Sequence, residues 1–477
     1  MRKYTFAALV GVLLASSAQP VLAQDAGPVA ATPAVPPAGG AVSLQDAVAI
    51  AMRSNPDIIQ AQMNKEAIEF ERRQAQGLYA PRVDIEASAG IRRLENQTRR
   101  TLDIADEELY PLEAGVVGNW TLLDFGRRRG ELIRQAARVD GASLRVVERS
   151  EFVALQIARQ YFDVLLQQRV VAASQDNVTF HQMLVSDLGK GVEQGSISIA
   201  DRQQAEERLQ SALVRQTEAT QDLNNATITL RRLTGLDIGQ VVVPPNLAAA
   251  LPASLDTAVG LARTRNPRVR EAKADVDSTY GLVKAAEGDL YPKIGLEVRG
   301  RVGEDIDGFR GETNDVQGRV VLNWNVFDGG INRAKVQEMV RRASEARYRL
   351  HAVEREAEED VRTAWTTMQS QSNIVTQVER QSQVSDDLLL SYRSQFNVGR
   401  RSLLDVLDAQ NTRYNTQVRL ETSRFSQLFA QYQTLAAVNG LLDALNIAPG
   451  AGAGETEREQ FDYGPPPPAE LQRRVRG

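Results

Sequence analysis

The sequence predicts a mainly α-helical, internally duplicated fold, in which long antiparallel helical hairpins extend from a small β part of four strands. Each half of the chain opens with the same motif, contains one proline-free span of 69 residues, and holds two segments of alternating apolar and polar residues. A repeated motif indicates two copies of one structural unit. A long span without proline favours one continuous helix, and strict alternation is typical of β-strands.

The duplication covers most of the chain. Ser43-Leu44-x-x-Ala47-Val48-x-x-Ala51-x-x-x-Asn55-Pro56 recurs 211 residues later, ending at Pro267. Asn119-Trp120-x-x-x-Asp124-x-Gly126 recurs 204 residues later, ending at Gly330. The difference of seven residues falls between Pro81 and Trp120, in a polar stretch where a surface loop would tolerate an insertion.

The N-terminus predicts export. Arg2 and Lys3 precede a short apolar run and Val21-Leu22-Ala23, which together indicate a signal peptide over 1–23. The alternative, a membrane anchor, is disfavoured because the apolar run is too short to span a bilayer. Residues 24–42, rich in Pro, Ala and Gly, are expected to be flexible, and the Gly- and Pro-rich tail over 447–477 to be disordered.

Composition narrows the chemistry. The chain has no cysteine, so it has no acceptor for an N-terminal lipid. Charged residues make up 25%, the mean hydropathy is −0.33, and the net charge of −5 gives no indication of nucleic-acid binding. We expect no metal site and no cofactor, because only two histidines occur and no phosphate-binding or HExxH motif is present.

The first repeat is predicted over 43–253. A short helix capped by Ser43 is followed by a second helix that begins at Pro56. The period then changes from 3.6 to 2, and strands are predicted over 82–92 and 112–123. Long helices are predicted over 127–193 and 199–234, and a helix of the first length would reach about 100 Å.

The second repeat, over 254–446, repeats this order. Strands are predicted over 293–302 and 315–327, and long helices over 330–397 and 403–445. A heptad-like seam of small apolar residues in the first of these helices favours close packing of helix on helix. The members of that seam spaced by seven are Val336, Ala343, Leu350, Ala357 and Ala364.

The four strands have the length that a tilted strand needs to cross a bilayer, about ten residues. Trp120 and Trp324 lie near strand ends, where aromatic residues are found at membrane interfaces. Polar connections over 92–111 and 303–308 match the long external loops of a transmembrane barrel. The alternative is an ordinary hairpin with one face on a soluble core.

Four strands cannot close a barrel, and an open edge in lipid leaves backbone groups without hydrogen bonds. Several chains must therefore share one barrel. Two chains would give eight strands, and three would give twelve with room for a channel. A charged set on one strand face favours water inside and hence a twelve-stranded trimer; its members are Asp84, Glu86, Arg92, Glu297, Arg299 and Arg301.

The combination of motifs resembles the TolC family of outer-membrane efflux and secretion channels. The resemblance covers residues 42–446 and includes the doubled opening motif, Trp324-x-x-Phe327-Asp328-Gly329-Gly330 and the segment from Phe396 to Gln410. It implies a homotrimer in the outer membrane of a Gram-negative bacterium, with a periplasmic helical tunnel. It also implies contact with outer-membrane lipid, a periplasmic adaptor protein and an inner-membrane ABC transporter or RND pump.

The same resemblance assigns a gate at the end of the tunnel. It implies that Arg401 contacts Asp201 of a neighbouring hairpin and holds the tunnel shut, and it places Phe396 where the family often has a tyrosine. Asp405 and Asp408, three residues apart on one helix face, would form an acidic ring in the lumen. Helix capping is the competing role for Asp201 and Asp405, because each follows a serine by three residues.

The turns of the two hairpins are the expected docking points for the adaptor. They contain Gln194 and Gly195 in the first repeat and Val398 and Gly399 in the second. The segment from Gln395 to Asp405 resembles the type I protein-secretion branch of the family. The alternatives are the outer-membrane component of a proton-driven multidrug efflux pump and, more remotely, a soluble periplasmic coiled-coil scaffold. An enzyme is not expected.

Overall fold

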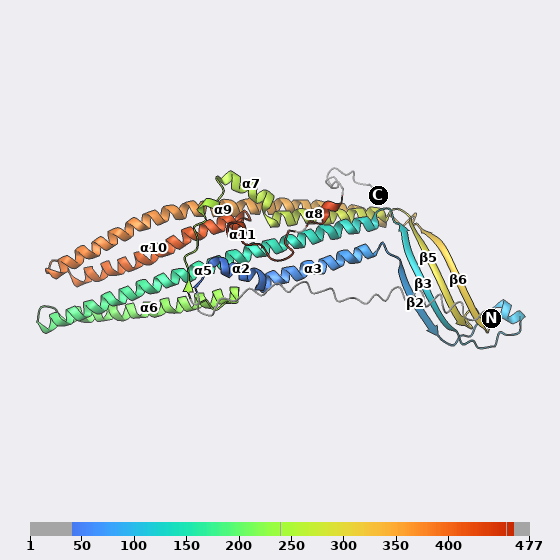
Figure 1. Cartoon of the computed structure of the whole chain (residues 1–477), viewed down its shortest axis with the longest axis horizontal. Helices are drawn as coiled ribbons and strands as arrows, with labels where there is room; N and C mark the ends of the chain where they lie inside the picture. The colour runs from blue at the N-terminus through green and yellow to red at the C-terminus, as the bar shows by residue number, and fades with distance from the viewer. Residues whose placement is uncertain (1–40, 239, 455, 462–477) are drawn as a thin grey trace.

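The computed structural model describes residues 41–238, 240–454 and 456–461. The predicted signal peptide, residues 24–40 of the predicted flexible segment and residues 462–477 of the predicted tail lie outside the described residues. Figure 1 shows an elongated molecule, with a small sheet at one end and the turns of two helical hairpins at the other. This arrangement confirms the predicted fold class, a duplicated helical chain with a small four-stranded β part.

The first repeat follows the predicted order of elements. Its elements are β1 (Ala41–Val42), α2 (Leu44–Ser54), α3 (Pro56–Gly77), β2 (Arg82–Ala89), α4 (Gln97–Thr101), β3 (Leu112–Leu123), α5 (Arg127–Glu193), α6 (Ile199–Thr234), β4 (Gln240–Val241) and the 3₁₀ turn η1 (Ala248–Ala250). Ser43 caps α2 by accepting the N–H of Asp46 at 3.1 Å. Pro56 begins α3 because a first-turn residue needs no N–H.

The second repeat repeats this architecture without a counterpart of α4. Its elements are α7 (Leu255–Arg265), α8 (Pro267–Gly288), β5 (Lys293–Glu304), β6 (Glu312–Asn323), α9 (Ile331–Asn397), α10 (Leu403–Ala437), α11 (Leu441–Ala444) and the 3₁₀ turn η2 (Arg458–Gln460). Both α5 and α9 are 67 residues long and therefore span about 100 Å.

Some element boundaries differ from the predicted ones. The helix predicted over 403–445 is divided between α10 and α11, because Asn439 adopts a left-handed φ of 56° before Gly440. The strand predicted over 82–92 ends at Ala89, and the strand predicted over 315–327 begins at Glu312 and ends at Asn323. Trp324 therefore lies just beyond its strand.

The end of the chain also differs from the expectation of disorder from residue 447. Residues 447–454 and 456–461 lie along α5 in space. There the Gly450 N–H donates to Ser150 Oγ at 3.0 Å. Arg458 forms ion pairs with Asp140 at 3.2 Å and with Asp277 at 3.0 Å. A Gly-rich composition predicts disorder only where no such specific partners exist.

The strands β2, β3, β5 and β6 form one antiparallel sheet in that order. Apart from a register shift between Thr121 and Leu123 of β3, the pairing places alternate residues on common faces, so one face is mainly apolar and the opposite face is charged. The apolar face includes Val83, Ile85, Ala114, Val116, Trp120, Leu296, Val298, Val302, Val316, Val320 and Leu322. The charged face includes Asp84, Glu86, Glu113, Glu297, Arg299, Arg301, Asp315 and Arg319.

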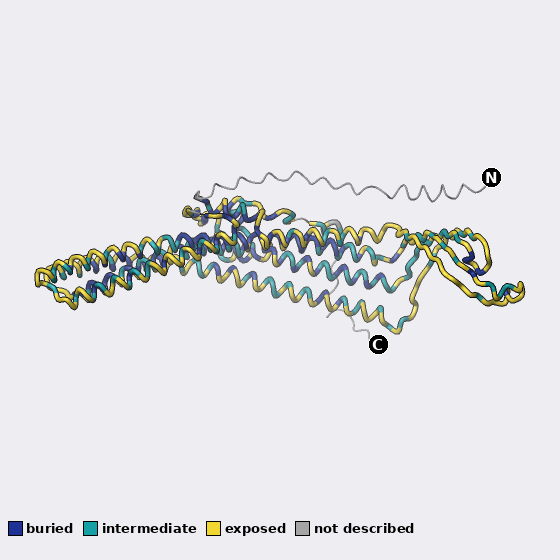
Figure 2. Tube along the Cα trace, turned by 90° about the horizontal axis from the view of Figure 1, so that it is seen from below, coloured by how far each residue is buried: buried dark blue, intermediate teal, exposed yellow. Residues whose placement is uncertain are grey.

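The main apolar core lies at the middle of the molecule, where Figure 2 shows many buried residues. Tyr161 of α5 is completely buried there. Its hydroxyl donates to the Val42 carbonyl at 2.7 Å and accepts the Val242 N–H at 2.7 Å. This pair of bonds fastens the short parallel sheet formed by β1 and β4 to the long helix.

The two repeats meet along α5 and α8, which lie side by side in Figure 1. At Gly130 a Cβ would lie 2.7 Å from the Gly281 carbonyl oxygen, and at Gly281 a Cβ would lie 2.6 Å from the Arg134 backbone nitrogen. The backbones can approach this closely only because both residues lack a side chain.

Candidate functional site

The four-stranded sheet exposes its apolar face and leaves two edges unpaired within this chain. Val83, Ile85, Val316 and Val320 are each more than 60% exposed, at 64%, 67%, 66% and 68%. The outer strands β2 and β6 each pair on one side only among the described residues. An exposed apolar face of this kind marks a membrane or protein contact. The predicted inward set shares the opposite face, except Arg92, which lies beyond β2 in an isolated bridge to Leu109.

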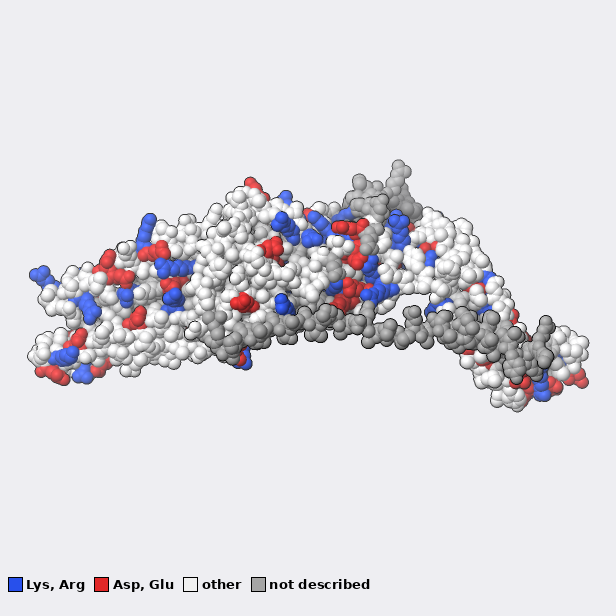
Figure 3. Space-filling model, in the orientation of Figure 1, with Lys and Arg blue, Asp and Glu red and all other residues white. Residues whose placement is uncertain are grey.

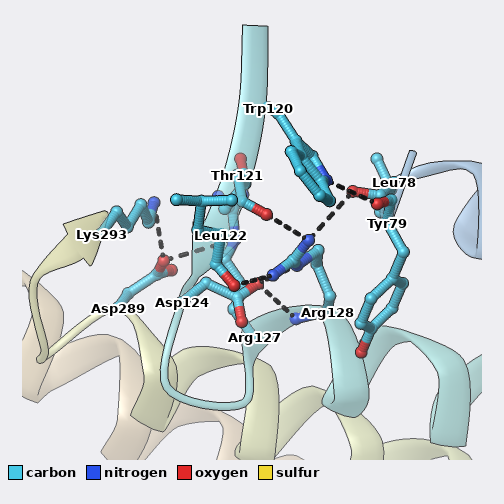
Figure 4. Close-up of polar contacts among 10 residues, drawn as sticks. All are labelled: Leu78, Tyr79, Trp120, Thr121, Leu122, Asp124, Arg127, Arg128, Asp289 and Lys293. Carbon is cyan, nitrogen blue, oxygen red and sulfur yellow. Dashed lines mark hydrogen bonds and ion pairs between the residues drawn. The ribbon is translucent and has the colours of Figure 1, made fainter. Parts of the chain in front are cut away.

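Each tryptophan predicted at the membrane interface forms a hydrogen bond that joins the end of a strand to the segment just after a preceding helix. The Trp120 indole N–H donates to the Tyr79 carbonyl at 2.9 Å, as Figure 4 shows. The Trp324 indole N–H donates to the Leu290 carbonyl at 3.3 Å. The two acceptors are 211 residues apart, so the duplicated motif preserves the same contact in both repeats.

Arg128 also stabilises this junction in the first repeat, where β3 leads into α5. Its Nε donates to Asp124 Oδ2 at 2.8 Å, and its Nη1 donates to the Thr121 carbonyl at 2.7 Å (Figure 4). The guanidinium also lies over the Tyr79 ring, 4.4 Å from its centre. These contacts satisfy carbonyls at the end of β3, where the regular strand pairing stops.

The hairpin turns lie at the end of the molecule farthest from the sheet. Gly195 and Gly399 have nearly equal left-handed φ values of 73° and 74°, a conformation that favours glycine. Gln194, Gly195, Val398 and Gly399 are all exposed, and Val398 is 68% exposed. These four residues therefore present a free surface in the single chain.

Ser198 and Ser402 cap the helices that follow the turns, and each accepts the N–H of the aspartate three residues later. Asp201 donates its N–H to Ser198 Oγ at 3.0 Å, and Asp405 donates its N–H to Ser402 Oγ at 3.2 Å. At the second turn the Ser402 N–H also donates to Asp405 Oδ2 at 3.3 Å, which completes a reciprocal capping box. The Ser402 hydroxyl donates to the Asp405 carboxylate and lowers its pKa below the usual value.

Arg401 contacts its own hairpin in this chain. Its Nε donates to Gln395 Oε1 at 3.1 Å, and its guanidinium lies 4.2 Å from the centre of the Tyr392 ring. A longer ion pair of 3.7 Å joins it to Asp405. Arg401 and Asp201 lie on different hairpins, and within the described part of this single chain no ion pair joins them, so the predicted contact would require another copy of the chain.

Phe396 joins the two hairpins through apolar contacts. It packs against two small clusters, one formed by Leu188, Ala205, Leu403 and Leu407 and the other by Leu389, Val406 and Ala409. Asp408 is exposed on α10, one helical turn beyond Asp405. The structure thus places the predicted gate and ring residues within one region, at the turn end of the hairpins.

A family model described as Outer membrane efflux protein matches residues 48–236 and 258–446, which together are most of the chain. The two matched segments coincide with the two structural repeats.

The chain belongs to the outer membrane efflux protein family.

Several known proteins are similar to this family member. The chain is 24% identical to the outer membrane efflux protein BepC of Brucella suis, over 68% of this chain and 71% of that protein. It is 24% identical to the alkaline protease secretion protein AprF of Pseudomonas aeruginosa, over 57% of this chain and 58% of that protein. The crystal structure of a membrane protein from Pseudomonas aeruginosa matches with a TM-score of 0.75 and 17% identity, covering 87% of this chain and 92% of that one.

As a member of the outer membrane efflux protein family, the chain is a transport conduit rather than an enzyme, in accord with the sequence analysis. It is located in the outer membrane of a Gram-negative bacterium and has a large periplasmic helical part. Over the described ranges between residues 41 and 461, no helix has the length and apolar character that a membrane crossing requires.

Sequence reasoning missed three residues that shape this efflux-family site. Gln395 and Tyr392 hold Arg401, and Arg128 holds the corner of β3 and α5. The i, i+4 spacing of Asp124 and Arg128 could have indicated an ion pair. No sequence pattern indicated Tyr392 or Gln395, because their contact with Arg401 depends on how the turn reverses the chain.

Proposed function

We propose that three copies of this chain combine their sheets into one twelve-stranded barrel and their helices into a continuous periplasmic tunnel. The observation that carries this proposal is the sheet with an exposed apolar face, a charged opposite face and two unpaired edges. In lipid, each unpaired edge must meet another edge. The charged face then lines water, and the apolar face contacts outer-membrane lipid.

The helices support the same assembly. Within the chain, α8 presents Gly281 to α5, whereas α3 has Phe70 at the corresponding position, 211 residues earlier, and Phe70 is 57% exposed. An exposed large aromatic side chain at a position that is a packing contact in the other repeat favours a contact with another copy. In a ring of copies, α3 would meet α9 of the next copy.

The second hairpin turn and one relative support a proposal for the cargo. The segment from Gln395 to Asp405 resembles the type I secretion branch, and AprF is by its name a secretion protein. We propose type I protein secretion with an ABC transporter and a periplasmic adaptor that contacts Gln194, Gly195, Val398 and Gly399. The second candidate is multidrug efflux with an RND pump, which the similarity to the efflux protein BepC favours.

At the turn end, we assign Arg401, Asp201 and Phe396 to the gate, and Asp405 and Asp408 to an acidic ring. On the face that Figure 3 shows, positive and negative side chains are interspersed along the helices among uncharged ones. A cation preference would therefore come from this ring rather than from the charge of that face. The Asp405 carboxylate in its capping box and the Asp201 carboxylate, which accepts the Ser198 hydroxyl, both keep further acceptor positions, so these contacts are compatible with a role in the gate or ring.

Two experiments test these assignments. The purified mature protein should run as a heat-sensitive trimer and conduct ions in planar bilayers; a monomer without conductance would contradict the assembly. Deletion of the gene should abolish export of a secreted protein while drug susceptibility changes little. Increased drug susceptibility with normal secretion would instead support the efflux-pump candidate.

A further inference from the structure

A small cavity lies between α5, α6 and α10, near the turn end of the hairpins. Its volume is about 80 Å³, which is room for a few water molecules or one small ion. The lining residues are Asn177 and His181 of α5, Arg208, Ser211, Ala212 and Arg215 of α6, and Leu407, Asp408 and Asn411 of α10. The cavity therefore touches both hairpins.

The lining is rich in hydrogen-bond donors. It contains two guanidinium groups, the amides of Asn177 and Asn411 and the hydroxyl of Ser211, against the single carboxylate of Asp408. Guanidinium groups prefer carboxylate, phosphate and related oxyanions, because their N–H groups match the spacing of two oxygens. Arg208 also forms an ion pair with Glu207, at 3.5 Å between Nε and Oε2, so the charge available to a ligand depends mainly on Arg215.

Arg215 is the best placed of these groups. Its Nη1 donates to Asn411 Oδ1 at 2.8 Å, and its guanidinium lies 5.7 Å from the centre of the Tyr414 ring. Among the residues that the structure describes, no carboxylate forms an ion pair with it. Its remaining N–H groups are therefore available to a bound anion.

His181 gives a second, independent indication of a ligand. The side chain is buried, with only 5% of the residue exposed, and its Nδ1 has no hydrogen-bond partner among the described residues. A buried polar atom without a partner is costly, so such atoms usually contact water or a ligand. Burial and the nearby Arg215 and Arg208 lower the pKa of His181 to about 4, and an anion in the cavity would offset the effect of the two arginines.

The corresponding place in the second repeat lacks this chemistry. At the positions 204 residues later, Ser385 replaces His181 and Thr412 replaces Arg208, although Arg419 corresponds to Arg215. The combination of a buried histidine and two arginines therefore belongs to the first hairpin alone, where it faces α10.

We propose that this cavity binds a small oxyanion of the sulfate or phosphate class, held by Arg208, Arg215 and His181 of the first hairpin and by Asn411 of the second. The α6 and α10 helices contact each other only sparsely, so such an ion would join two hairpins that are otherwise connected mainly through α5. The site lies within one chain and does not depend on the proposed assembly or cargo.

Anomalous diffraction with selenate, a sulfate analogue, tests the proposal directly. Crystals of the purified full-length protein grown in selenate should show an anomalous peak inside the cavity. The peak should disappear in Arg215→Met and remain in Arg419→Met, which removes the matching arginine of the second repeat. Absence of the peak in the wild-type protein at saturating selenate, or its persistence in Arg215→Met, would overturn the assignment.

Thermal unfolding gives an independent measurement in solution. Sulfate stabilises proteins in general, so the informative quantity is the upward shift of the melting midpoint relative to chloride at equal ionic strength. This shift should be larger for the wild-type protein and Arg419→Met than for Arg215→Met; equal shifts would contradict binding at this site. Planar-bilayer conductance of the same samples tests the duct function separately.

Discussion

The two hairpin turns have the same backbone but different side-chain contacts. Both reverse at a glycine with a φ near 74°, and both are followed by a Ser-x-x-Asp cap. In the first turn Ile197 fits against Gly191, where a Cβ would lie 2.5 Å from the isoleucine side chain. At the corresponding positions of the second turn, Arg401 donates to Gln395. The glycine–isoleucine contact of the first turn is thus replaced by a glutamine–arginine contact in the second turn, while the backbone conformation of the turn is the same.

The same relation holds along the helices. Gly281 lies against α5, whereas its counterpart Phe70 is exposed, and the buried Asp140 and Glu151 of α5 correspond to Ser344 and the exposed Arg355 of α9. The backbone of a repeat thus depends on a few helix caps, glycine turns and tryptophan hydrogen bonds that both copies retain. The side chains that differ are those with different neighbours in the two copies.

The largest effect is expected where the repeats touch most closely. Gly281→Leu would force α8 away from the α5 backbone, at a cost of about 3 kcal/mol or more, since overpacked cores cannot relax fully. We expect little or no heat-sensitive assembled protein in isolated membranes. Phe70→Leu changes the matching position of the first repeat and should reduce assembly far less. Equal yields of assembled protein from the two variants would show that the packing of α8 on α5 is no more sensitive than the exposed position of α3.

Glu151 makes the core of the first repeat sensitive to pH. Burial raises the pKa of Glu151 from 4.5 to about 8, while its carboxylate accepts the Leu442 N–H at 3.3 Å. The folded protein therefore binds a proton that the unfolded chain releases, and stability should fall as the pH rises from about 5 to 8, by a few kcal/mol at most, since one pKa unit corresponds to about 1.4 kcal/mol.

Melting midpoints measured across that range should therefore decrease in the wild-type protein and change less in Glu151→Gln. The matched control is Arg355→Gln, at the exposed counterpart in α9, which should keep the wild-type slope. A wild-type slope in Glu151→Gln would show that another group is responsible.

The tail should stabilise the contact between the two repeats, because Arg458 pairs with Asp140 of α5 and with Asp277 of α8. Arg458→Ala leaves the buried Asp140 without its guanidinium partner, although the Arg458 backbone N–H still donates to Asp140 at 3.3 Å. We expect a loss of about 1–3 kcal/mol, measured as a lower melting midpoint. In an Asp140→Ser background, which copies the serine of the second repeat, the same substitution should cost clearly less. Equal losses in both backgrounds would argue against a specific pair.

Arg401→Ala should weaken the second turn and raise the single-channel conductance in planar bilayers. The contact of the guanidinium with the Tyr392 ring contributes about 0.5–1 kcal/mol at an exposed site. Ile197→Ala alters the matching position of the first turn and should leave the conductance nearer to the wild-type value. Unchanged conductance in Arg401→Ala would count against its role in the gate.

The smallest effect is expected at Asp408. Asp408→Ala should weaken the block of the channel by multivalent cations, because the exposed carboxylate would attract them through a water-filled lumen. Gln204→Ala changes the matching position of the first repeat and should preserve the block. If the blocking affinity of Asp408→Ala equals that of the wild-type protein, the ring lies elsewhere.

Most of the helices, strands and turns could be predicted from the sequence, because they depend on local and periodic features. Prolines and serines mark the helix starts, glycines mark the turns, and alternation defines the two sheet faces; accordingly α5 and α6 have the predicted bounds. The division at Asn439 was missed, because a single left-handed asparagine leaves the helical pattern on both sides intact.

The site was predictable only in part, since its contacts join segments far apart in the chain. The capping role of Asp405 followed from its spacing to Ser402, and the structure contains that cap. The contact of Arg401 with the Tyr392 ring and the cavity around His181 depend on which helix faces meet. Neither feature produces a periodic pattern within a single segment of the sequence. The ordered tail was missed for the same reason, because its partners Asp140 and Asp277 lie far from it in the sequence.

The ion pairs of Arg458 have a consequence for biogenesis. This residue is synthesised after every helix it touches, and it can reach Asp140 and Asp277 together only once α5 and α8 are already aligned. Docking of the C-terminal segment therefore comes after the alignment of these two helices. Until that step the segment is accessible to proteases, so its cleavage would distinguish newly exported, immature chains from finished ones.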